Sequence, residues 1–189
     1  MKKIGIYGGT FDPIHHGHLI LARQACEELK LDQLIFVPAA LSPFKQRPAQ
    51  ASGETRLAML RAAIEGEKDF MVDDCELKRP PPSYSIDTVV QLREREPNAG
   101  LFWLIGADNV GGLNQWHRFP ELEKLVQFVV LDRGYVETPC TAYPVVQRKV
   151  DISATDIRNR VASGRSIRYL VPPAVEEIIR RGNIYREQK

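Results

Sequence analysis

The segment with the clearest chemistry runs from Gly8 to His18, directly after a short apolar run at the start of the sequence. Gly8 and Gly9 have no side chain beyond hydrogen, so a ligand can approach their backbone closely. His15 and His18 follow one helical turn apart at the start of an apolar-periodic segment, where unpaired N–H groups and the helix dipole favour an anion. This spacing predicts a loop that binds phosphate.

Neither of the common phosphate-binding motifs is present here. The dinucleotide fingerprint G-x-G-x-x-G is absent from this loop, and the stretch from Gly106 to Gly111 continues with Gly112-Leu113, where a P-loop requires Lys and then Ser or Thr. Two other interpretations of the histidines stay open. They could be a helix cap and a solvated side chain, or they could bind zinc, although His16 and His117 are the only further histidines and no Cys or acidic residue has ligand spacing.

A second segment of similar chemistry lies near the C-terminal end, at residues 152–158. Ser153 followed by Asp156 three positions later is typical of a helix start and would by itself indicate only a common cap. Arg158 follows one turn on, so this helix start offers hydroxyls from Ser153 and Thr155 together with a guanidinium. The two helix starts together could hold one triphosphate.

Strands and helices that alternate along the chain must position these residues. Short apolar runs predict strands at 3–7, 34–37, 70–72, 101–105, 128–131 and, more weakly, 144–150. Helical periodicity occupies 18–29, 55–64, 86–92, 155–162 and 173–181. This order predicts an α/β protein with a Rossmann-like, doubly wound parallel sheet, whose ligand site lies beyond the carboxyl ends of the strands.

The 189 residues are expected to form a single domain. Residues 1–150 would form the doubly wound core, and residues 151–189 a small helical C-terminal extension. Irregular stretches at 8–15, 38–53, 73–85, 106–116 and 132–143 each follow a predicted strand, so all of them should open onto the same edge of the sheet.

Composition excludes several classes of function. A net charge of +2 is too small to indicate sequence-independent binding to nucleic acid, and no apolar run is long enough to cross a membrane. The three cysteines are far apart and lack C-x-x-C spacing, so neither a disulfide framework nor a thiolate zinc site is expected. These features favour a cytoplasmic protein, and the sequence leaves a homo-oligomer open.

The two segments carry a family resemblance. Residues 8–18 resemble the H-x-G-H signature of the nucleotidyltransferase superfamily, and residues 152–158, Ile-Ser-Ala-Thr-Asp-Ile-Arg, resemble its second signature, I-S-x-T-x-I-R. Within that superfamily the chain is most similar to the bacterial nicotinate mononucleotide adenylyltransferases. The resemblance extends over nearly the whole chain and includes Gly8-Gly9-Thr10-Phe11-Asp12-Pro13, Pro43-Phe44-Lys45, Ser83-Tyr84-Ser85-Ile86-Asp87-Thr88, Gly106-Ala107-Asp108 and Trp116.

Two positions depart from the family pattern. Phe44 stands where the family often has His, which removes a donor for phosphate. Ser85 stands where the family often has Thr, which keeps the hydroxyl and loses a methyl group.

The resemblance implies a reaction in NAD biosynthesis. ATP and nicotinate mononucleotide would give nicotinate adenine dinucleotide and pyrophosphate, with Mg²⁺ as cofactor held mainly by the phosphates rather than by protein ligands. The attacking phosphate monoester is already largely dianionic at neutral pH, so no general base is required. The resemblance assigns catalysis to His15, His18, Lys45 and Arg158, and binding of the ATP phosphates to Gly8, Gly9, Thr10, Phe11, Ser153 and Thr155.

The same resemblance assigns the acceptor site. Trp116 would lie against the pyridine ring, Ser85 and the amide of His117 would meet its carboxylate, and Asp108 would bind the ribose. Arg133 could meet the phosphate of the mononucleotide. Without the family, Trp116 would be read as core packing, Asp108 as a helix cap and Arg133 as a solvated side chain.

Two alternative functions differ in testable ways. A sister adenylyltransferase would use nicotinamide mononucleotide or phosphopantetheine and would differ in the acceptor pocket, at Trp116 and Ser85. A non-catalytic nucleotide-binding protein would bind ATP without releasing pyrophosphate.

Overall fold

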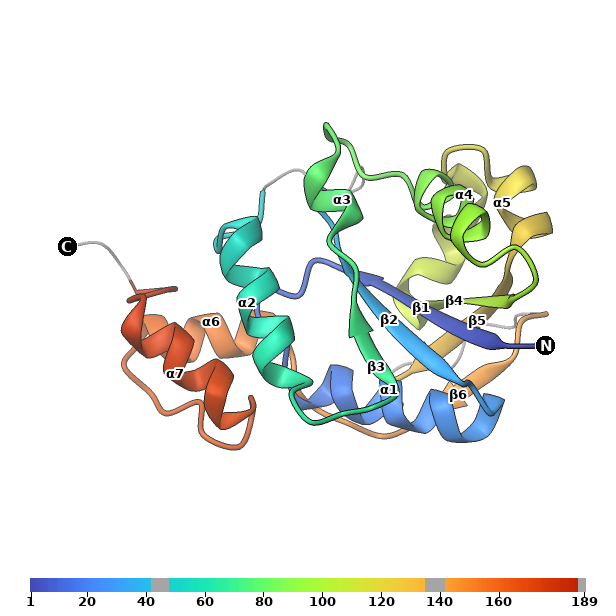
Figure 1. The fold of residues 1–189 in the computed structure, drawn as a ribbon. Helices are drawn as coiled ribbons and strands as arrows, with labels where there is room; N and C mark the ends of the chain where they lie inside the picture. Colours follow the sequence, from blue (N-terminus) through green and yellow to red (C-terminus); the bar gives the residue numbers. More distant parts are fainter. Residues whose placement is uncertain (42–47, 135–141, 187–189) are drawn as a thin grey trace.

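The predicted parallel sheet is present and has six strands. The computed structural model describes residues 1–41, 48–134 and 142–186, and within them the strand order is β3-β2-β1-β4-β5-β6, with every neighbouring pair parallel (Figure 1). The strands are β1 (Lys3–Gly9), β2 (Gln33–Pro38), β3 (Phe70–Val72), β4 (Gly100–Gly106), β5 (Gln127–Asp132) and β6 (Val145–Gln147).

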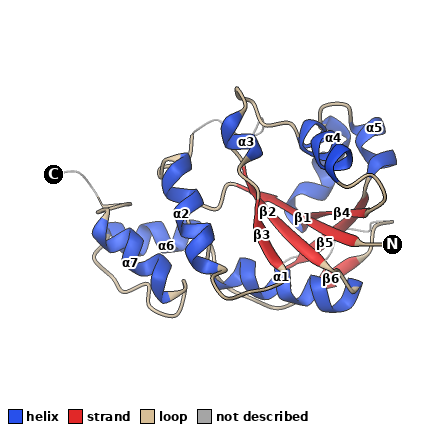
Figure 2. Ribbon diagram, viewed as in Figure 1, coloured by secondary structure: helices blue, strands red, loops and turns tan. Residues whose placement is uncertain are grey.

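Helices cover both faces of the sheet (Figure 2). Buried side chains of α1 (His16–Leu29), α2 (Gly53–Ala63), α6 (Ala154–Ala162) and α7 (Pro173–Arg181) share one apolar cluster with Tyr7 and Leu104. Those of α3 (Cys75–Lys78), α4 (Ser85–Arg95), α5 (Phe119–Leu125) and the 3₁₀ helix η1 (Ala107–Gln115) share the other, with Ile6 and Ile105. Neighbouring strand residues thus enter opposite layers, as the two-residue period of a strand requires.

Some local predictions were wrong. Residues 73–85 and 106–116, predicted to be irregular, contain α3 and η1, and α5 was not predicted at all. These helices are short, and α5 buries only Leu122, so no apolar period could be recognised in it. The sixth strand covers three residues rather than the seven predicted.

The C-terminal helices pack onto the core. Val175 and Ile179, four residues apart on α7, are almost fully buried in the same cluster as Met59 and Leu60 of α2, and α7 lies against α2 in Figure 1. The division at residue 150 remains a prediction. None of the helices in the described ranges combines the length and apolar character needed to span a bilayer.

The topology identifies where a ligand should bind. β1 is a central strand that pairs with β2 on one side and with β4 on the other. The chain after β1 continues to β2, and the chain after β4 continues to β5 on the opposite side of the sheet. The chain therefore leaves β1 and β4 toward opposite faces, and the space between their carboxyl ends is the usual ligand crevice of such sheets.

Candidate active site

A cavity of about 280 Å³ opens at this crevice. It brings together most of the residues predicted for the two substrates, although they come from segments far apart in the sequence. The predicted residues in its lining are Gly8, Gly9, Thr10, Phe11, His18, Ser85, Asp108, Trp116, His117 and Arg133. His15, Ser153, Thr155 and Arg158 are not among the lining residues, and Lys45 lies outside the described residues.

The glycine pair is required by packing as well as by access. A Cβ atom on Gly8 would lie 3.1 Å from the ring of Trp103, and one on Gly9 would lie 2.8 Å from the ring of Phe11. Phe11 itself has a left-handed φ of +48°, unusual for a side chain of its size. Its ring meets His18 edge to face at a centroid distance of 5.1 Å, so the turn of the loop supports the imidazole from the side.

A buried acid that the sequence analysis did not single out holds this loop in place. Asp12 is 6% exposed, and its carboxylate accepts hydrogen bonds from the backbone N–H groups of Gln50 (2.8 Å) and Ala51 (3.1 Å) and from the hydroxyl of Tyr185 (2.7 Å). Its only sequence signal was its place in the G-G-T-F-D-P motif. Three chain segments therefore meet at one side chain.

Arg56 braces the same loop from α2. It is 2% exposed, and its Nη1 donates to the carbonyl oxygens of Thr10 and Ala39, both at 2.8 Å. The first of these carbonyls belongs to the phosphate loop, and the second follows β2. Nothing in the local sequence separates this arginine from the solvated ones, because its partners are backbone groups distant in the sequence.

His18 is held in a defined tautomer. The backbone N–H of His15 donates to its Nδ1 at 3.3 Å, so this nitrogen is an acceptor and the neutral ring carries its proton on Nε2. The ring stacks on that of His15 at a centroid distance of 3.7 Å. The backbone at the start of α1 thus determines which ring nitrogen of His18 is the donor, and His18 lines the cavity.

His15 is buried beneath His18 and is 1% exposed. Burial, together with the nearby positive charge of Arg133, lowers the pKa of His15 to about 3, so its ring is neutral at physiological pH. Its Nδ1 is buried, and no described residue forms a hydrogen bond with it. A Cβ atom on Gly17 would lie 3.0 Å from this ring, which explains why glycine stands between the two histidines.

The start of α1 offers less free backbone than the sequence suggested. The N–H of His16 donates to the carbonyl of Leu170 at 3.0 Å, and the N–H of His18 donates to the carbonyl of His15 at 2.9 Å. Two of the N–H groups expected to meet an anion are therefore bonded within the protein. The side chain of His18, rather than the helix terminus alone, carries the anion-binding chemistry.

The second signature lies beside the phosphate loop. The Oγ of Ser153 accepts from the N–H of Asp156 at 3.1 Å, so this hydroxyl caps α6 as the simpler interpretation stated. Arg158 donates from Nη1 to the carbonyl of Asp12 at 2.8 Å and from Nη2 to Thr155 Oγ1 at 3.1 Å. The guanidinium is thereby fixed against the loop that follows β1.

The other end of the cavity is aromatic. Trp116 is half-buried and contacts Trp103 and Phe128 edge to face, with centroid distances of 6.5 and 6.2 Å. It therefore packs on the core and also lines the cavity. The ring of His117 lies over that of Tyr84 at 4.3 Å, so the loop after η1 meets the start of α4 here.

Arg133 and Asp108 place opposite charges in the cavity. Arg133 follows β5, donates to the carbonyl of Ile152 at 3.3 Å and hydrogen-bonds the phenol of Tyr7. Burial raises the pKa of Tyr7 to about 12, and the guanidinium opposes that rise. Asp108 lies in the first turn of η1, and its Oδ1 accepts from Asn109 Nδ2 at 3.2 Å.

The described residues do not support the zinc alternative. Nowhere in the ranges 1–41, 48–134 and 142–186 do three or more His, Cys, Asp or Glu side chains gather in a way that could hold a metal ion. Cys26 and Cys75 are free and buried.

Comparison with known proteins gives a consistent result. A family model described as cytidylyltransferase-like matches residues 6–160. A protein of Exiguobacterium sibiricum described as a probable nicotinate-nucleotide adenylyltransferase is 43% identical over 97% of this chain and 98% of its own. One of Shouchella clausii with the same description is 43% identical over 98% of this chain and 97% of its own.

Solved structures share the fold. The nicotinic acid mononucleotide adenylyltransferase of Plasmodium falciparum complexed with NaAD matches with a TM-score of 0.81 and 19% sequence identity, over 98% of both chains. A second structure of that enzyme, complexed with APC, matches with a TM-score of 0.77 and 18% identity, again over 98% of both chains.

Proposed function

The chain belongs to the cytidylyltransferase-like family, and we propose that its cavity holds the phosphates of ATP beside His18 and the pyridine ring of an acceptor beside Trp116. It catalyses adenylyl transfer from ATP to nicotinate mononucleotide, which gives nicotinate adenine dinucleotide and pyrophosphate in NAD biosynthesis. The observation that carries the assignment of the site is the fixed tautomer of His18 at the carboxyl end of β1.

The chemistry needs positioning rather than a base. A phosphate oxygen of the mononucleotide attacks the α-phosphorus of ATP, and the bond from that phosphorus to the oxygen bridging to the β-phosphate breaks as pyrophosphate leaves. The attacking phosphate is largely dianionic near neutral pH, since its second pKa is about 6. The protein must therefore align two anions and neutralise the charge that develops on the transferred group.

His18 is suited to that task because its Nε2 carries a proton. Donation from Nε2 to an oxygen of the α- or β-phosphate would strengthen as negative charge builds up in the transition state. His15 is the second proposed donor, and its unpartnered buried Nδ1 supports a polar contact that forms only when substrate is bound. Gly8, Gly9, Thr10 and Phe11 would surround the same phosphates.

Two cationic side chains complete the proposed phosphate site. Arg158 lies against the loop through the bond of Nη1 to the carbonyl of Asp12, and Nη2 donates to Thr155, so the N–H donors that remain are proposed to bind phosphate. Lys45, which lies outside the described residues, is proposed to hold phosphate as well. Ser153 and Thr155 would contribute through the start of α6.

The described residues fit a Mg²⁺ ion that arrives with ATP. This ion usually keeps several waters and binds substrate phosphates with few protein ligands. We therefore assign the triphosphate oxygens, rather than protein side chains, as its main ligands. When bound, it would neutralise charge on the leaving pyrophosphate.

The start of α4 supports recognition of a carboxylate. Tyr84 at the N-cap and Ser85, where α4 begins, both line the cavity, and the N–H of Asp87 donates to the carbonyl of Tyr84. We propose that the other N–H groups of this helix start and the Ser85 hydroxyl meet the carboxylate. An anion is favoured at such a terminus, and an amide is favoured less. Trp116 would stack on the ring, with the amide of His117 as a second donor.

The remaining groups of the mononucleotide have proposed partners of matching chemistry. Asp108 would accept from the ribose hydroxyls, since it lies directly after β4 at the mouth of the crevice. Arg133 would bind the mononucleotide phosphate. A location in the cytoplasm and a homo-oligomeric state remain predictions.

A pyrophosphate-release assay with ATP and a panel of acceptors tests the function. We expect release with nicotinate mononucleotide, much less with nicotinamide mononucleotide, and none with phosphopantetheine or without acceptor. A preference for nicotinamide mononucleotide or phosphopantetheine would identify a sister adenylyltransferase. ATP binding without release for any acceptor would identify a nucleotide-binding protein.

A further inference from the structure

A buried carboxylate that no step of the reaction uses lies in the wall of the acceptor end of the cavity. Glu76 belongs to the four-residue helix α3, is 5% exposed and lines the cavity together with Ser83, Tyr84 and Ser85. Burial of an acid is unfavourable unless hydrogen bonds compensate for the lost water. The partners of Glu76 therefore indicate why an acid is placed there.

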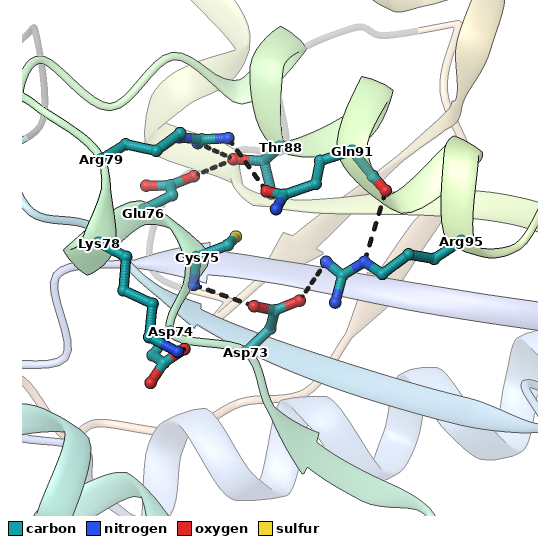
Figure 3. A network of polar contacts seen from close by, with 9 residues as sticks. All are labelled: Asp73, Asp74, Cys75, Glu76, Lys78, Arg79, Thr88, Gln91 and Arg95. Atoms are coloured by element: carbon teal, nitrogen blue, oxygen red, sulfur yellow. Dashed lines mark hydrogen bonds and ion pairs between the residues drawn. The ribbon is translucent and has the colours of Figure 1, made fainter.

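Two hydroxyls donate to this carboxylate. Thr88 Oγ1 donates to Glu76 Oε1 at 2.6 Å, and the Ser83 hydroxyl forms a second hydrogen bond with the same side chain (Figure 3 shows the first). Burial raises the pKa of Glu76, whereas these hydrogen bonds and the nearby Arg79 guanidinium favour its ionised form. Each of these hydroxyl oxygens already accepts from another group, so its own proton is left for the carboxylate.

Each hydroxyl is itself a link to another segment. Ser83 Oγ accepts from the N–H of Ala40 at 3.0 Å, which ties it to the chain after β2. Thr88 Oγ1 accepts from Arg79 Nη2 at 2.7 Å, as Figure 3 shows. Glu76 thus fixes one residue on each side of Ser85, the position at which α4 begins.

From this geometry we infer that Glu76 is a positioning and specificity-determining residue for the acceptor, because its carboxylate holds Ser83 and Thr88 and thereby aims the first turn of α4 at the acceptor's carboxylate. The inference rests on the proposed function of the cavity. Thr88 is fully buried and lies one helical turn after Ser85, so a shift of its side chain moves the turn that carries the N–H groups. A negative charge so close to an anionic acceptor would by itself oppose binding.

The neighbouring groups offset that charge. Two hydroxyl donors occupy the carboxylate, and Arg79 lies close enough to share Thr88 with it. The positional effect therefore outweighs the repulsion, and loss of Glu76 should weaken binding of the acid acceptor. A purely electrostatic role of Glu76 would predict the opposite, namely stronger binding of the acid acceptor when the negative charge is lost.

Replacement by glutamine tests it, since the amide keeps the shape but replaces one of the two acceptor oxygens with an NH₂ group, which cannot accept a hydrogen bond. For Glu76→Gln we expect the KM for nicotinate mononucleotide to rise roughly tenfold, while kcat and the KM for ATP change by less than about twofold. The preference for the acid over nicotinamide mononucleotide should fall by a similar factor. Thr88→Val should reproduce both effects, and the double variant should be no worse than the worse single one, because the two residues form one unit.

Asp73→Asn is the matched control. Asp73 belongs to the same polar network in Figure 3, where it accepts from the N–H of Cys75 at 2.9 Å and pairs with Arg95, but it does not line the cavity. Its loss should lower the melting temperature without changing either KM. Thr88→Ser, which keeps the hydroxyl, should restore the KM values that Thr88→Val loses.

The outcomes are distinct. An unchanged acid preference in both Glu76→Gln and Thr88→Val, or a lower KM for the acid in Glu76→Gln, would overturn the inference even when both proteins fold. If Asp73→Asn changed the KM values and the acid preference as Glu76→Gln and Thr88→Val do, Glu76 would have only a general structural role. Absence of adenylyl transfer by the unmodified protein would instead refute the proposed function, before any variant is compared.

Discussion

The two ends of the cavity are held in place by different parts of the chain. At the phosphate end, Asp12 accepts from Tyr185 across 173 positions, its carbonyl accepts from Arg158 across 146, and the carbonyl of Thr10 accepts from Arg56 across 46. Around the start of α4 at the acceptor end, Glu76, Arg79 and Thr88 lie within 12 positions of one another, and the bond from Ala40 to Ser83 spans 43.

This contrast separates two tasks. The groups that would handle the transferred phosphate depend on nearly the whole fold, so they cannot shift without loss of packing in several segments. The groups that would read the pyridine ring and the carboxylate of the acceptor lie in or next to α3, α4 and the 3₁₀ helix η1. Changes at the phosphate end should therefore reduce the rate of transfer for every acceptor, whereas changes at the acceptor end should alter which acceptor is used.

Removal of Mg²⁺ should give the largest effect and should be confined to the phosphate end. In excess chelator we expect pyrophosphate release to stop, because charge on the departing pyrophosphate is no longer neutralised. Binding of nicotinate mononucleotide alone, measured by the quenching of tryptophan fluorescence, should persist. Turnover that continues in chelator would contradict this division, and activity must return when Mg²⁺ is added back.

His18→Ala should lower kcat by roughly a hundredfold or more, about 3 kcal/mol of transition-state stabilisation, since a preorganised donor is lost. The loss should be the same for every acceptor that reacts. Steady-state kinetics measure it, and an unchanged circular dichroism spectrum shows that the fold is kept. His16→Ala, at a neighbouring residue outside the cavity lining, serves as control. Near-normal turnover of His18→Ala would refute the donor role.

Trp116→Ala tests the acceptor end of the cavity. The KM for nicotinate mononucleotide is expected to rise by about tenfold, the loss of roughly one good aromatic stacking contact, with little change in the KM for ATP. Initial rates at varied concentrations of each substrate measure both constants. Equal changes in the two KM values would mean that Trp116 supports the whole cavity rather than the pyridine ring.

Tyr185→Phe should give the smallest effect. Loss of one buried hydrogen bond to Asp12 should lower the free energy of unfolding by about 1 kcal/mol, which corresponds to roughly 2–4 °C in Tm for a chain of this length. A slightly looser phosphate loop should reduce kcat a few-fold for all acceptors. Tyr143→Phe removes an exposed bond to Glu123 and is the matched control. A change in acceptor preference in Tyr185→Phe would contradict the proposed division of tasks between the two ends of the cavity.

Much of the architecture could be predicted because it follows from periodic patterns. The strands that are buried on both faces, such as β1 and β4, are continuous apolar runs, and α1 and α7 have a regular apolar stripe. Helix α5 could not be predicted because only Leu122 is buried in it. The order of the strands could not be predicted in this way, because the alternation of elements and right-handed crossovers are compatible with more than one doubly wound order.

The residues of the site could be predicted only where residues with functional side chains lie close together in the sequence at a characteristic spacing. His18 and Gly17 stand in one short motif, and the clash that a Cβ atom at Gly17 would make with His15 gives that motif a physical reason. Arg56, Tyr185 and Glu76 were missed because each acts through a partner distant in the sequence or through a backbone group. The role of Ser153 as a cap, by contrast, follows from three residues of local sequence.

The bond between Tyr185 and Asp12 also has a consequence for biosynthesis of the protein. The residues of β1, the glycine loop and α1 are synthesised first, yet the carboxylate at the base of that loop gains its third donor only after residue 185 has left the ribosome. Translation products that stop before that point would carry both histidines on a loop that lacks this one brace. Synthesis of the chain as far as residue 185 and full bracing of the phosphate loop are thus coupled by a single phenol.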